Sequence, residues 1–434
     1  MQNTVVLNET QNVIDKEIPL LKTFYDSLKY KFDQRYGIQN INNFLKSNAD
    51  RNQENDLRQR IIDRIISQGF TIDENNNIIP PDMNNKLDLR AYHSDARKDK
   101  YQKNIKFIKE KEKDILKYFA NGTEIEIESF SPKIQAIEYN TEEYDIFKYA
   151  TLLWSVPVSN GFGRRVKFLI WDESNHKVVG LFALGDPVFN LRCRDSLVGW
   201  DHHQRCKKLY NVMDIFILGA VPPYNLLLGG KLTALAAASN EVREIIKTKY
   251  KDKKTIIQKQ IKDPSLVLLT TGSALGKSSL YDRIRYEERT VYQKIGESLG
   301  YGHFHLNNGL YKDMVEYLKT KDYRVAVAYK FGQGPNWKIR AAKTSLKYLG
   351  FSDDLLKHGI KREIYSVPLA KNYLEFLNGH SNKPIFFDMP FEKLADYWYQ
   401  RWFINRAKTK AEYKEFRREK ISILVHSARN DGGL

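Results

Sequence analysis

MDIFILGAVPPYNLLLGGKLTALAAAS, residues 213–239, is the stretch that predicts how the centre of this chain folds. It begins inside an apolar run, residues 212–221, that is stopped by two prolines and predicts a buried strand. The turn leads to Gly229 and Gly230, and residues 231–247 predict a helix. A buried strand followed by a tight turn and a helix is typical of a sheet with a crossover helix on one face.

Short β-rich runs lie on both sides of this segment. Residues 166–171 (VKFLIW) and 177–184 (KVVGLFAL) flank a polar turn and predict a hairpin. Residues 266–271 (LVLLTT) predict another strand, and residues 324–329 (RVAVAY) predict a weaker one. The strict alternation of residues 123–128 (TEIEIE) predicts a half-buried strand. These patterns indicate an α+β, or mixed α/β, centre built on a twisted sheet.

Helical patterns dominate the two ends of the chain. Apolar residues at three-to-four-residue spacing predict a helix around residues 57–66, and a second helix is expected over residues 94–120. Residues 351–434 are basic and aromatic and predict a helical C-terminal region. We therefore expect a helical region over residues 1–122 and an α/β core over residues 123–350, followed by that C-terminal region.

Composition limits the class of protein. The chain has 434 residues, of which 42% are hydrophobic and 12% aromatic, so a large folded core is expected and wholesale disorder is excluded. Lys and Arg number 70 against 53 Asp and Glu, and the net charge of +17 favours a polyanionic partner. Two cysteines exclude a disulfide framework and a four-cysteine zinc site. Because the sequence shows neither a signal peptide nor a membrane span, we expect a soluble, cytoplasmic protein without membrane contact; a homo-oligomer stays open.

The glycine-rich helix start is a candidate phosphate site. Backbone N–H groups at a helix N-terminus bind anions, so Gly229, Gly230 and Lys231 are expected to hold a phosphate or pyrophosphate. The order of hairpin, strand, turn, helix and strand resembles the core of the GNAT acetyltransferases, whose matching helix receives the pyrophosphate of acyl-CoA. Leu226 and Lys231 depart from that family's motif. The alternative interpretation is that the two glycines only permit close packing of helix and strand.

A second phosphate candidate is TTGSALGKSS, residues 270–279. It follows a predicted strand, as a nucleotide-binding P-loop does, but three residues separate Gly272 from Gly276 where that motif needs four. Its hydroxyl and cationic side chains still suit a phosphate, and the alternative is a capped turn with surface charges. The donors predicted here are Ser273, Lys277, Ser278 and Arg283.

Several carboxylates are candidates for catalysis. Asp195 beside Arg194, or Asp214 in the buried strand, would act as a general base if burial raised its pKa toward neutrality. Asp195 and Asp282 are also among the carboxylates that a magnesium-dependent nuclease would use. The alternative for Arg194 and Asp195 is a structural ion pair. The histidines and cysteines lack the spacing of a zinc site, so no metal is expected, and the cofactor is unknown.

Basic segments with aromatic neighbours predict contact with nucleic acid. Residues 98–113, 161–165, 244–263 and 401–420 carry Lys and Arg that would neutralise phosphates, and nearby aromatic rings would stack on bases. Each segment alone is also typical of a solvated helix face. The individual candidates are Arg164, Arg165, Lys249, Lys251, Lys253, Lys254, Arg401, Arg406, Lys408, Lys410, Arg417 and Arg418.

Five stretches in the middle of the chain form one ordered set. They are FLIWD (168–172), GLFALGDPVFNLRCRD (180–195), VGWD (198–201), the stretch 213–239 quoted above, and TTGSALGKSSLYDRIRY (270–286). The set resembles the DruA family of bacterial Druantia anti-phage systems, whose shared domain has no assigned function and also occurs near transposons. The resemblance implies a multi-gene defence system with a large helicase-like partner. It supplies no catalytic residues.

We therefore expect a nucleic-acid-binding component of an anti-phage system that acts on DNA rather than RNA, together with a helicase-like partner. The first alternative is an acyl- or nucleotidyl-type transferase that uses the core cleft. The second is a metal-dependent nuclease. Whether the chain is an enzyme stays open. Steep loss of binding with salt would favour nucleic-acid binding, and retained CoA or nucleotide would favour the transferase.

Overall fold

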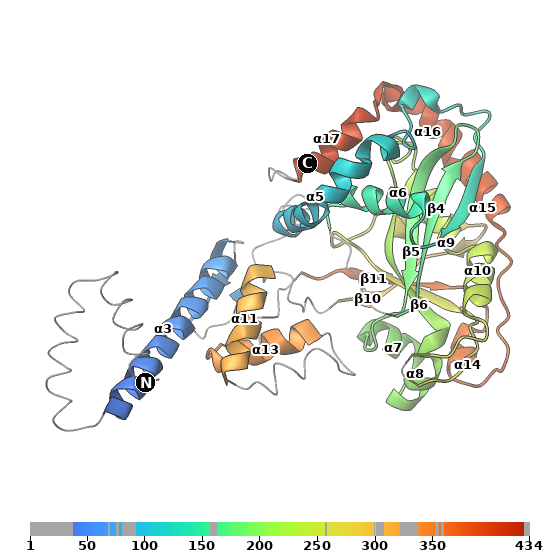
Figure 1. Cartoon of the computed structure of the whole chain (residues 1–434). Helices are drawn as coiled ribbons and strands as arrows, with labels where there is room; N and C mark the ends of the chain where they lie inside the picture. Colours follow the sequence, from blue (N-terminus) through green and yellow to red (C-terminus); the bar gives the residue numbers. More distant parts are fainter. Residues whose placement is uncertain are drawn as a thin grey trace.

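The computed structural model describes residues 38–67, 70–74, 78–79, 93–156, 163–256, 258–298, 300, 308–321, 337–351, 356 and 360–428. Within these residues, a seven-stranded sheet runs in the order β10-β11-β7-β6-β5-β4-β3 and carries helices on both faces (Figure 1). The α+β class predicted from the sequence is confirmed.

The sheet joins an antiparallel half to a half that contains a parallel pair. Strands β3 to β6 are antiparallel neighbours, and β4 and β5 are the predicted hairpin. β6 pairs with β7 in parallel, but only residues 212–214 and 268–270 take part. The strand bounds are β3 Pro132–Ile137, β4 Arg165–Asp172, β5 Lys177–Gly185, β6 Val212–Ala220, β7 Leu268–Gly272, β10 Gln293–Glu297 and β11 Glu363–Pro368.

The crossover from β6 to β7 passes over one face of the sheet. Its first helix, α9 (Gly229–Ala237), packs on β5 and β6. Its second helix, α10 (Asn240–Tyr250), begins where the Ser239 hydroxyl accepts the backbone N–H of Val242 at 3.5 Å. The single helix predicted over residues 231–247 is therefore wrong, because this cap starts a new helix after Ala237.

The C-terminal region covers α9 on the same face. Helix α15 (Phe391–Trp398) packs on α9, and the π-helical turn η6 (Tyr399–Phe403) continues it. Trp398 and Phe403 are fully buried in the main core, and the indole N–H of Trp398 donates to the carbonyl of Leu228 at 3.0 Å. The C-terminal region is thus part of the core rather than an appendage.

The opposite face of the sheet carries two groups of helices. The first group packs on β4 to β6, and the second packs around the first residues of β6 and β7. The first consists of α5 (Ser94–Leu116), α6 (Glu142–Ala150) and α17 (Glu419–Ser427); the second consists of α7 (Arg192–Val198), α8 (His202–Lys208) and α14 (Tyr373–Leu377).

A smaller helical unit has its own core. Helices α3 (Ile38–Ser67), α11 (Asn308–Lys321) and α13 (Trp337–Tyr348) pack through residues such as Ile61, Met314 and Leu346. None of the helices in the described part of the chain combines the length and the apolar character that a bilayer span requires.

Two predicted elements differ in the structure. Residues 123–128 form no strand, because Asn121 and Glu124 cap a short 3-10 turn, η1 (Gly122–Glu124). Within the C-terminal region predicted as helical, β11 is a strand between β7 and β10, and all six of its residues are buried. The strand predicted over residues 324–329 lies outside the described residues, and the division into three regions stays a prediction.

Gly122 tests how tightly the C-terminal region is joined to the core. A Cβ atom there would lie 1.8 Å from the carbonyl oxygen of Tyr413 and 2.7 Å from Cα of Lys414. Because both atoms belong to backbone, we expect Gly122→Ala to lower the free energy of unfolding by about 2–3 kcal/mol. Urea unfolding followed by tryptophan fluorescence measures this. The control is Gly379→Ala, because a Cβ atom at Gly379 would have no atom within 4 Å. Its φ is +77°, so this variant should lower the free energy of unfolding only by the roughly 1 kcal/mol that left-handed backbone costs. Equal midpoints for Gly122→Ala and wild type would contradict the prediction.

Candidate functional site

Cations from three separate segments meet beside the first turn of α9. Lys231 belongs to α9, Arg283 to the 3-10 turn η4 (Tyr281–Arg283), and Arg401 to η6. Burial lowers the pKa of the Lys231 ammonium, and the charges of Arg283 and Arg401 lower it further. Among the described residues, none of these three cations is paired with a carboxylate. The structure thus brings together residues that the sequence singled out in three unrelated motifs.

Aromatic rings surround these cations. The Lys231 ammonium lies 4.1 Å from the centroid of the Trp402 ring, and the Arg401 guanidinium lies 5.4 Å from the same centroid. Tyr397 meets Trp402 edge to face at 5.5 Å, and Tyr286 meets Tyr397 in the same way at 5.3 Å. All three rings are half-buried. We call these six residues (Lys231, Arg283, Arg401, Tyr286, Tyr397 and Trp402) the α9 surface.

The two glycines at this helix start have different roles. A Cβ atom on Gly229 would lie 2.8 Å from the carbonyl oxygen of Tyr224, so this glycine permits close packing, whereas Gly230 has only ordinary neighbours. The N–H of Gly229 donates to Tyr224 at 2.9 Å, and the N–H of Lys231 donates to Leu228 at 2.9 Å. Because these N–H groups are engaged, an anion here would be held mainly by side chains.

The loop over residues 270–279 meets a carboxylate of the protein itself. The N–H of Ser278 donates to Glu363 Oε2 at 3.2 Å, and its hydroxyl accepts the N–H of Tyr281 at 3.2 Å. The Ser273 hydroxyl donates to the carbonyl of Gly276. Lys277 is exposed. These contacts are typical of the capped-turn interpretation, because Ser278 and Ser273 already use their polar groups on the protein itself.

Asp282 belongs to a second polar contact near this loop. The Tyr365 hydroxyl lies 2.7 Å from Asp282 Oδ1 and 2.5 Å from Glu363 Oε2. Burial acts to raise the pKa of Glu363, but hydrogen bonds from Lys294, Tyr365 and Ser278 outweigh it, and the pKa is lowered overall. Asp282 itself is exposed to solvent.

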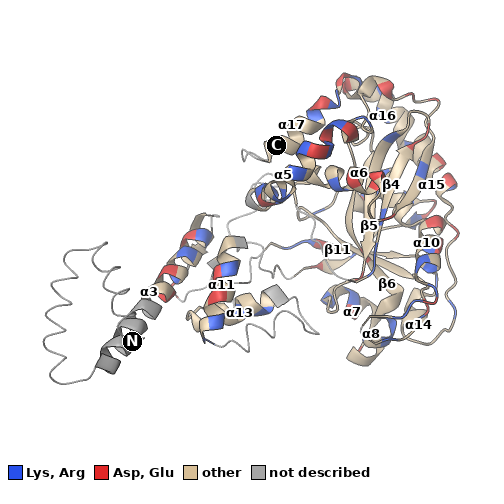
Figure 2. Cartoon of the chain, viewed as in Figure 1, with Lys and Arg blue, Asp and Glu red and all other residues tan. Residues whose placement is uncertain are grey.

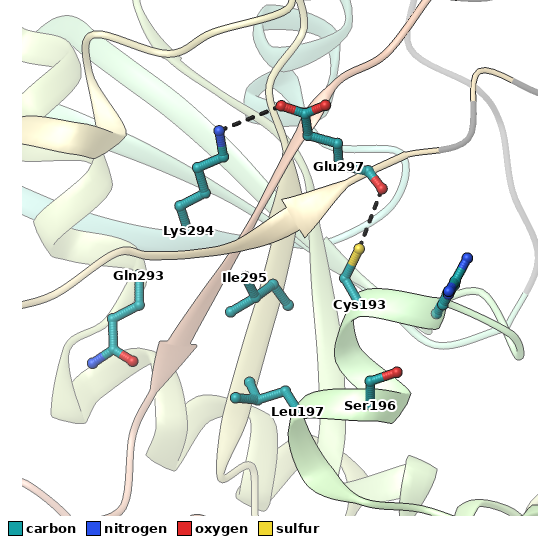
Figure 3. Close-up of a pocket in the computed structure, with 8 residues that line it drawn as sticks. Cys193, Ser196, Leu197, Gln293, Lys294, Ile295 and Glu297 are labelled. Carbon is teal, nitrogen blue, oxygen red and sulfur yellow. Dashed lines mark hydrogen bonds and ion pairs between the residues drawn. The ribbon is translucent and has the colours of Figure 1, made fainter.

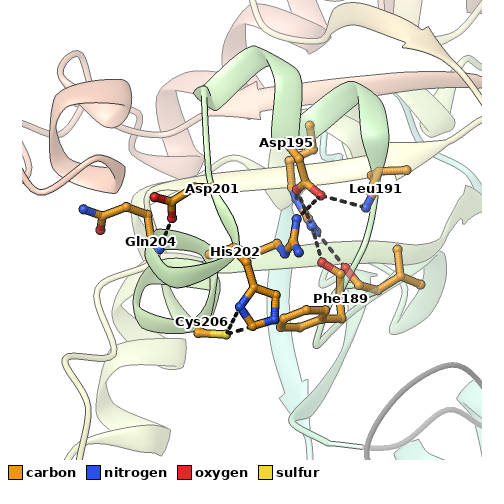
Figure 4. Close-up of polar contacts among 10 residues, drawn as sticks. Phe189, Leu191, Asp195, Asp201, His202, Gln204 and Cys206 are labelled. Carbon is orange, nitrogen blue, oxygen red and sulfur yellow. Dashed lines mark hydrogen bonds and ion pairs between the residues drawn. The ribbon is translucent and has the colours of Figure 1, made fainter.

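Arg194 and Asp195 form a buried ion pair that organises the loop before α7. The fully buried Arg194 guanidinium donates to Asp195 Oδ1 at 2.6 Å and to the carbonyls of Val188 and Phe189 at 2.8 Å. Asp195 also accepts from Arg205 at 3.1 Å and from the N–H of Leu191 at 3.1 Å (Figure 4). These contacts favour the structural alternative for the pair.

The same view shows the polar residues of α8. Asp201 caps this helix by accepting the N–H of Gln204 at 2.7 Å, and the Cys206 sulfur lies 3.8 Å from His202 Nδ1 (Figure 4). Within the described residues, no cluster of three or more His, Cys, Asp or Glu side chains is placed to hold a metal ion.

A pocket of about 560 Å³ is lined by residues of α7 and of the edge strand β10. Figure 3 shows Cys193 on one side, where its thiol donates to the carbonyl of Glu297 at 3.2 Å, and Lys294 on the other side. A Cβ atom on Gly296 would lie 2.6 Å from the Cys193 sulfur, so only glycine fits this approach. None of the residues predicted for catalysis or phosphate binding lines the pocket.

Asp214 lies in a row of polar residues that crosses the sheet. Arg165 pairs with Gly185, Gly185 with Asp214, Asp214 with Thr270, and Thr270 with Ser366. Paired residues point to the same face of a sheet, and the Thr270 hydroxyl indeed donates to Asp214 Oδ1 at 3.0 Å. We call these five residues the polar row. It lies on the face opposite α9.

The Asp214 carboxyl is surrounded by protein atoms but keeps part of its surface open to solvent. Burial raises its pKa to about 6, although the Thr270 hydrogen bond and the charges of Arg194 and Arg165 act in the opposite direction. A carboxyl whose pKa is raised toward neutrality by burial is typical of functional sites.

The remaining basic candidates divide into paired and unpaired residues. Arg164 donates to Asp186 Oδ1 at 2.7 Å, Lys249 to Glu138 at 2.8 Å, and Arg418 to Glu124. Figure 2 shows blue and red residues interspersed along the helices rather than one continuous basic face. Arg406 donates to the carbonyl of Leu226, and Arg417 donates to the carbonyl of Lys414. The Lys410 ammonium lies 3.8 Å from the Glu412 carboxylate. The remaining candidates, Lys251, Lys253, Lys254 and Lys408, are exposed.

Sequence reasoning missed part of each site. It named Asp214 but not Thr270 or Ser366, although each is a polar residue inside an apolar strand, which is a usable signal. It named the α9 cations but not Tyr286 or Tyr397 as their neighbours, because only the tertiary structure brings β8 (Arg285–Tyr286) beside α15.

Asp214→Asn should stabilise the protein at neutral pH. The pKa of Asp214 is raised from 3.8 to about 6, so folding favours the protonated form, and stability is lost as the pH rises from about 4 through about 6. A shift of this size corresponds to roughly 3 kcal/mol, which partial exposure reduces to about 1–2 kcal/mol. Urea unfolding at about pH 7.5 should show the variant more stable by that amount, and the difference should vanish near pH 4. A variant no more stable than wild type at pH 7.5 would contradict this.

Comparison with known proteins agrees with the resemblance seen in the sequence. The family described as Druantia protein DruA matches residues 83–379. A Druantia protein DruA of Escherichia coli (strain UMEA 4076-1) is 39% identical over 363 residues, which cover 83% of this chain and 90% of that protein. No solved structure matches the chain significantly, so the likeness to the GNAT core stays a prediction. The chain belongs to the DruA family of Druantia proteins.

Proposed function

We propose that this protein is the nucleic-acid-binding component of a Druantia anti-phage defence system. Family membership supports a role in that system. The α9 surface supports the molecular role: Lys231, Arg283 and Arg401 converge without a described carboxylate partner beside three half-buried rings. Cations of this kind neutralise phosphates, and neighbouring aromatic rings stack on bases.

The proposed ligand is DNA, which the protein would present to a helicase-like partner of the same system in the bacterial cytoplasm. The α9 surface suits a strand whose bases are accessible, because stacking requires an open base face that a duplex does not offer. The Lys231 ammonium lies over the Trp402 ring, so this contact holds the charge in one place before a phosphate binds.

The transferase remains a second candidate because one observation favours it. The parallel pairing of β6 and β7 ends at Asp214 and Thr270, although β6 continues to Ala220 and β7 to Gly272 with other partners. The two strands therefore diverge next to a carboxyl whose pKa is about 6. Native mass spectrometry of the purified protein tests this candidate, since it requires retained CoA or nucleotide. No contact described here favours the nuclease.

The α9 surface should determine how steeply binding depends on salt. We expect the triple variant Lys231→Gln, Arg283→Gln, Arg401→Gln to bind single-stranded DNA more weakly. Its log–log salt slope should be smaller by about 2, because each lost phosphate contact removes about 0.7. Fluorescence anisotropy with single-stranded DNA, duplex DNA and RNA of the same sequence, over a salt series, measures both quantities.

The control removes the same charge elsewhere. Lys312 on α11, Lys347 on α13 and Lys383 after α14 are exposed and do not belong to the α9 surface, so their triple change to Gln should leave the slope nearly unchanged. Equal slopes for the two triple variants would show that net charge alone drives binding. Absence of binding by the wild-type chain at low salt would reject the proposed function.

A further inference from the structure

A second group of cations lies on the face of the sheet opposite α9. Arg165 and Lys167 are two residues apart on β4 and point to the same face, and Lys148 belongs to α6, which packs over that face. The Lys167 ammonium lies 3.9 Å from the centroid of Tyr144 and 5.4 Å from that of Phe147, both on α6. We call Lys148, Lys167 and Arg165 the β4–α6 cations.

Aromatic rings fix all three side chains in place. The Lys148 ammonium lies 3.8 Å from the centroid of Phe107 on α5, and the Arg165 guanidinium lies 4.0 Å from that of Phe216 on β6. All three cations are half-buried. Contact with a ring face offsets only part of the hydration that a buried charge loses, so cations of this kind gain from an anion.

The described carboxylates do not neutralise the two lysines. Among the described residues, neither Lys148 nor Lys167 forms an ion pair, and the nearby Asp145 is already 3.3 Å from Lys111. Burial lowers the pKa of Lys167 to about 8, and the charge of Arg165 adds to this. Burial likewise lowers the pKa of Lys148; Asp145 opposes this and Lys167 adds to it. The lysines therefore repel each other and Arg165, and neither of them has a described carboxylate within ion-pair distance.

The polar row meets an aromatic ring at the inner end of this group. Gly185 lies in register between Arg165 and Asp214, so the β5 position between these two charges carries no polar side chain. A Cβ atom there would lie 3.2 Å from the Phe216 ring, so this ring packs directly against the glycine. The negative charge of Asp214 interacts with the positive charges of Arg165 and Arg194, but it is not among the charges that shift the pKa of Lys167.

We propose that Lys148, Lys167 and Arg165 form a second anion site, which binds a phosphate group on the face of the sheet opposite the α9 surface. Three cations converging from a strand and a helix suit a phosphate, whose oxygens accept several charge-assisted hydrogen bonds at once. The phosphate would come from a free nucleotide or from a nucleic-acid backbone. The site does not depend on the proposed function, because none of its residues belongs to the α9 surface.

Binding to the full-length protein tests the site. Inorganic phosphate, ATP and a short single-stranded oligonucleotide are titrated separately at low salt by calorimetry, with thermal shift as a second readout. We expect at least one of these probes to bind wild type and to bind Lys167→Gln about tenfold or more weakly. The probe that binds identifies the source of the phosphate. Lys148→Gln, on a surface helix, gives the same test if Lys167→Gln does not fold.

Asp214→Asn separates a ligand site from a merely structural cluster. Removing this negative charge should tighten phosphate binding several-fold, because the remaining cations are then less compensated. The triple Gln variant of the α9 surface should keep the phosphate binding, and Lys167→Gln should keep the salt slope of that surface. The proposal is overturned if none of the three probes binds wild type, or if folded Lys167→Gln and Lys148→Gln bind as wild type does.

Discussion

The close approach of α9 to strands β5 and β6 is the constraint on which the rest of the structure depends. A Cβ atom on Gly180 would lie 2.5 Å from the Thr233 hydroxyl, and one on Gly229 would lie 2.8 Å from the Tyr224 carbonyl. Small residues on both sides therefore allow the helix to lie directly on the sheet. This contact places Lys231 at the rim of the core and directs the chain back to lay β7 alongside β6.

The two charged regions follow from that arrangement and lie on opposite faces of one sheet. On the α9 face, the C-terminal residues of η6 complete a group that begins in the crossover helix. On the other face, alignment of β7 with β6 puts Thr270 beside Asp214, in line with Arg165. Lys231 on the first face and Lys148, Arg165 and Lys167 on the second are held half-buried at a cost to stability, which is typical of residues kept for binding rather than for folding.

Local patterns were enough to predict the hairpin, the central strand and the start of α9, because each is an apolar run with clear turn residues at its ends. The strand predicted from the alternation of residues 123–128 is wrong, because the capping contacts between Asn121 and Glu124 outweigh strand propensity. β11 was missed because its partner Thr271 lies far away in the sequence. Each cation of the α9 surface was predicted from a separate motif, but tertiary contacts decide that the three side chains lie close together. The polar row depends on strand register, which no local pattern reports.

The late position of β11 in the chain bears on synthesis of the protein. This strand lies between β7 and β10, yet it follows both of them in the sequence. While the ribosome is still translating residues before 363, β7 and β10 each have a backbone edge without the partner that will later join them. The sheet can close only after most of the chain has emerged, so a nascent chain stalled earlier exposes strand edges that invite aggregation or capture by chaperones.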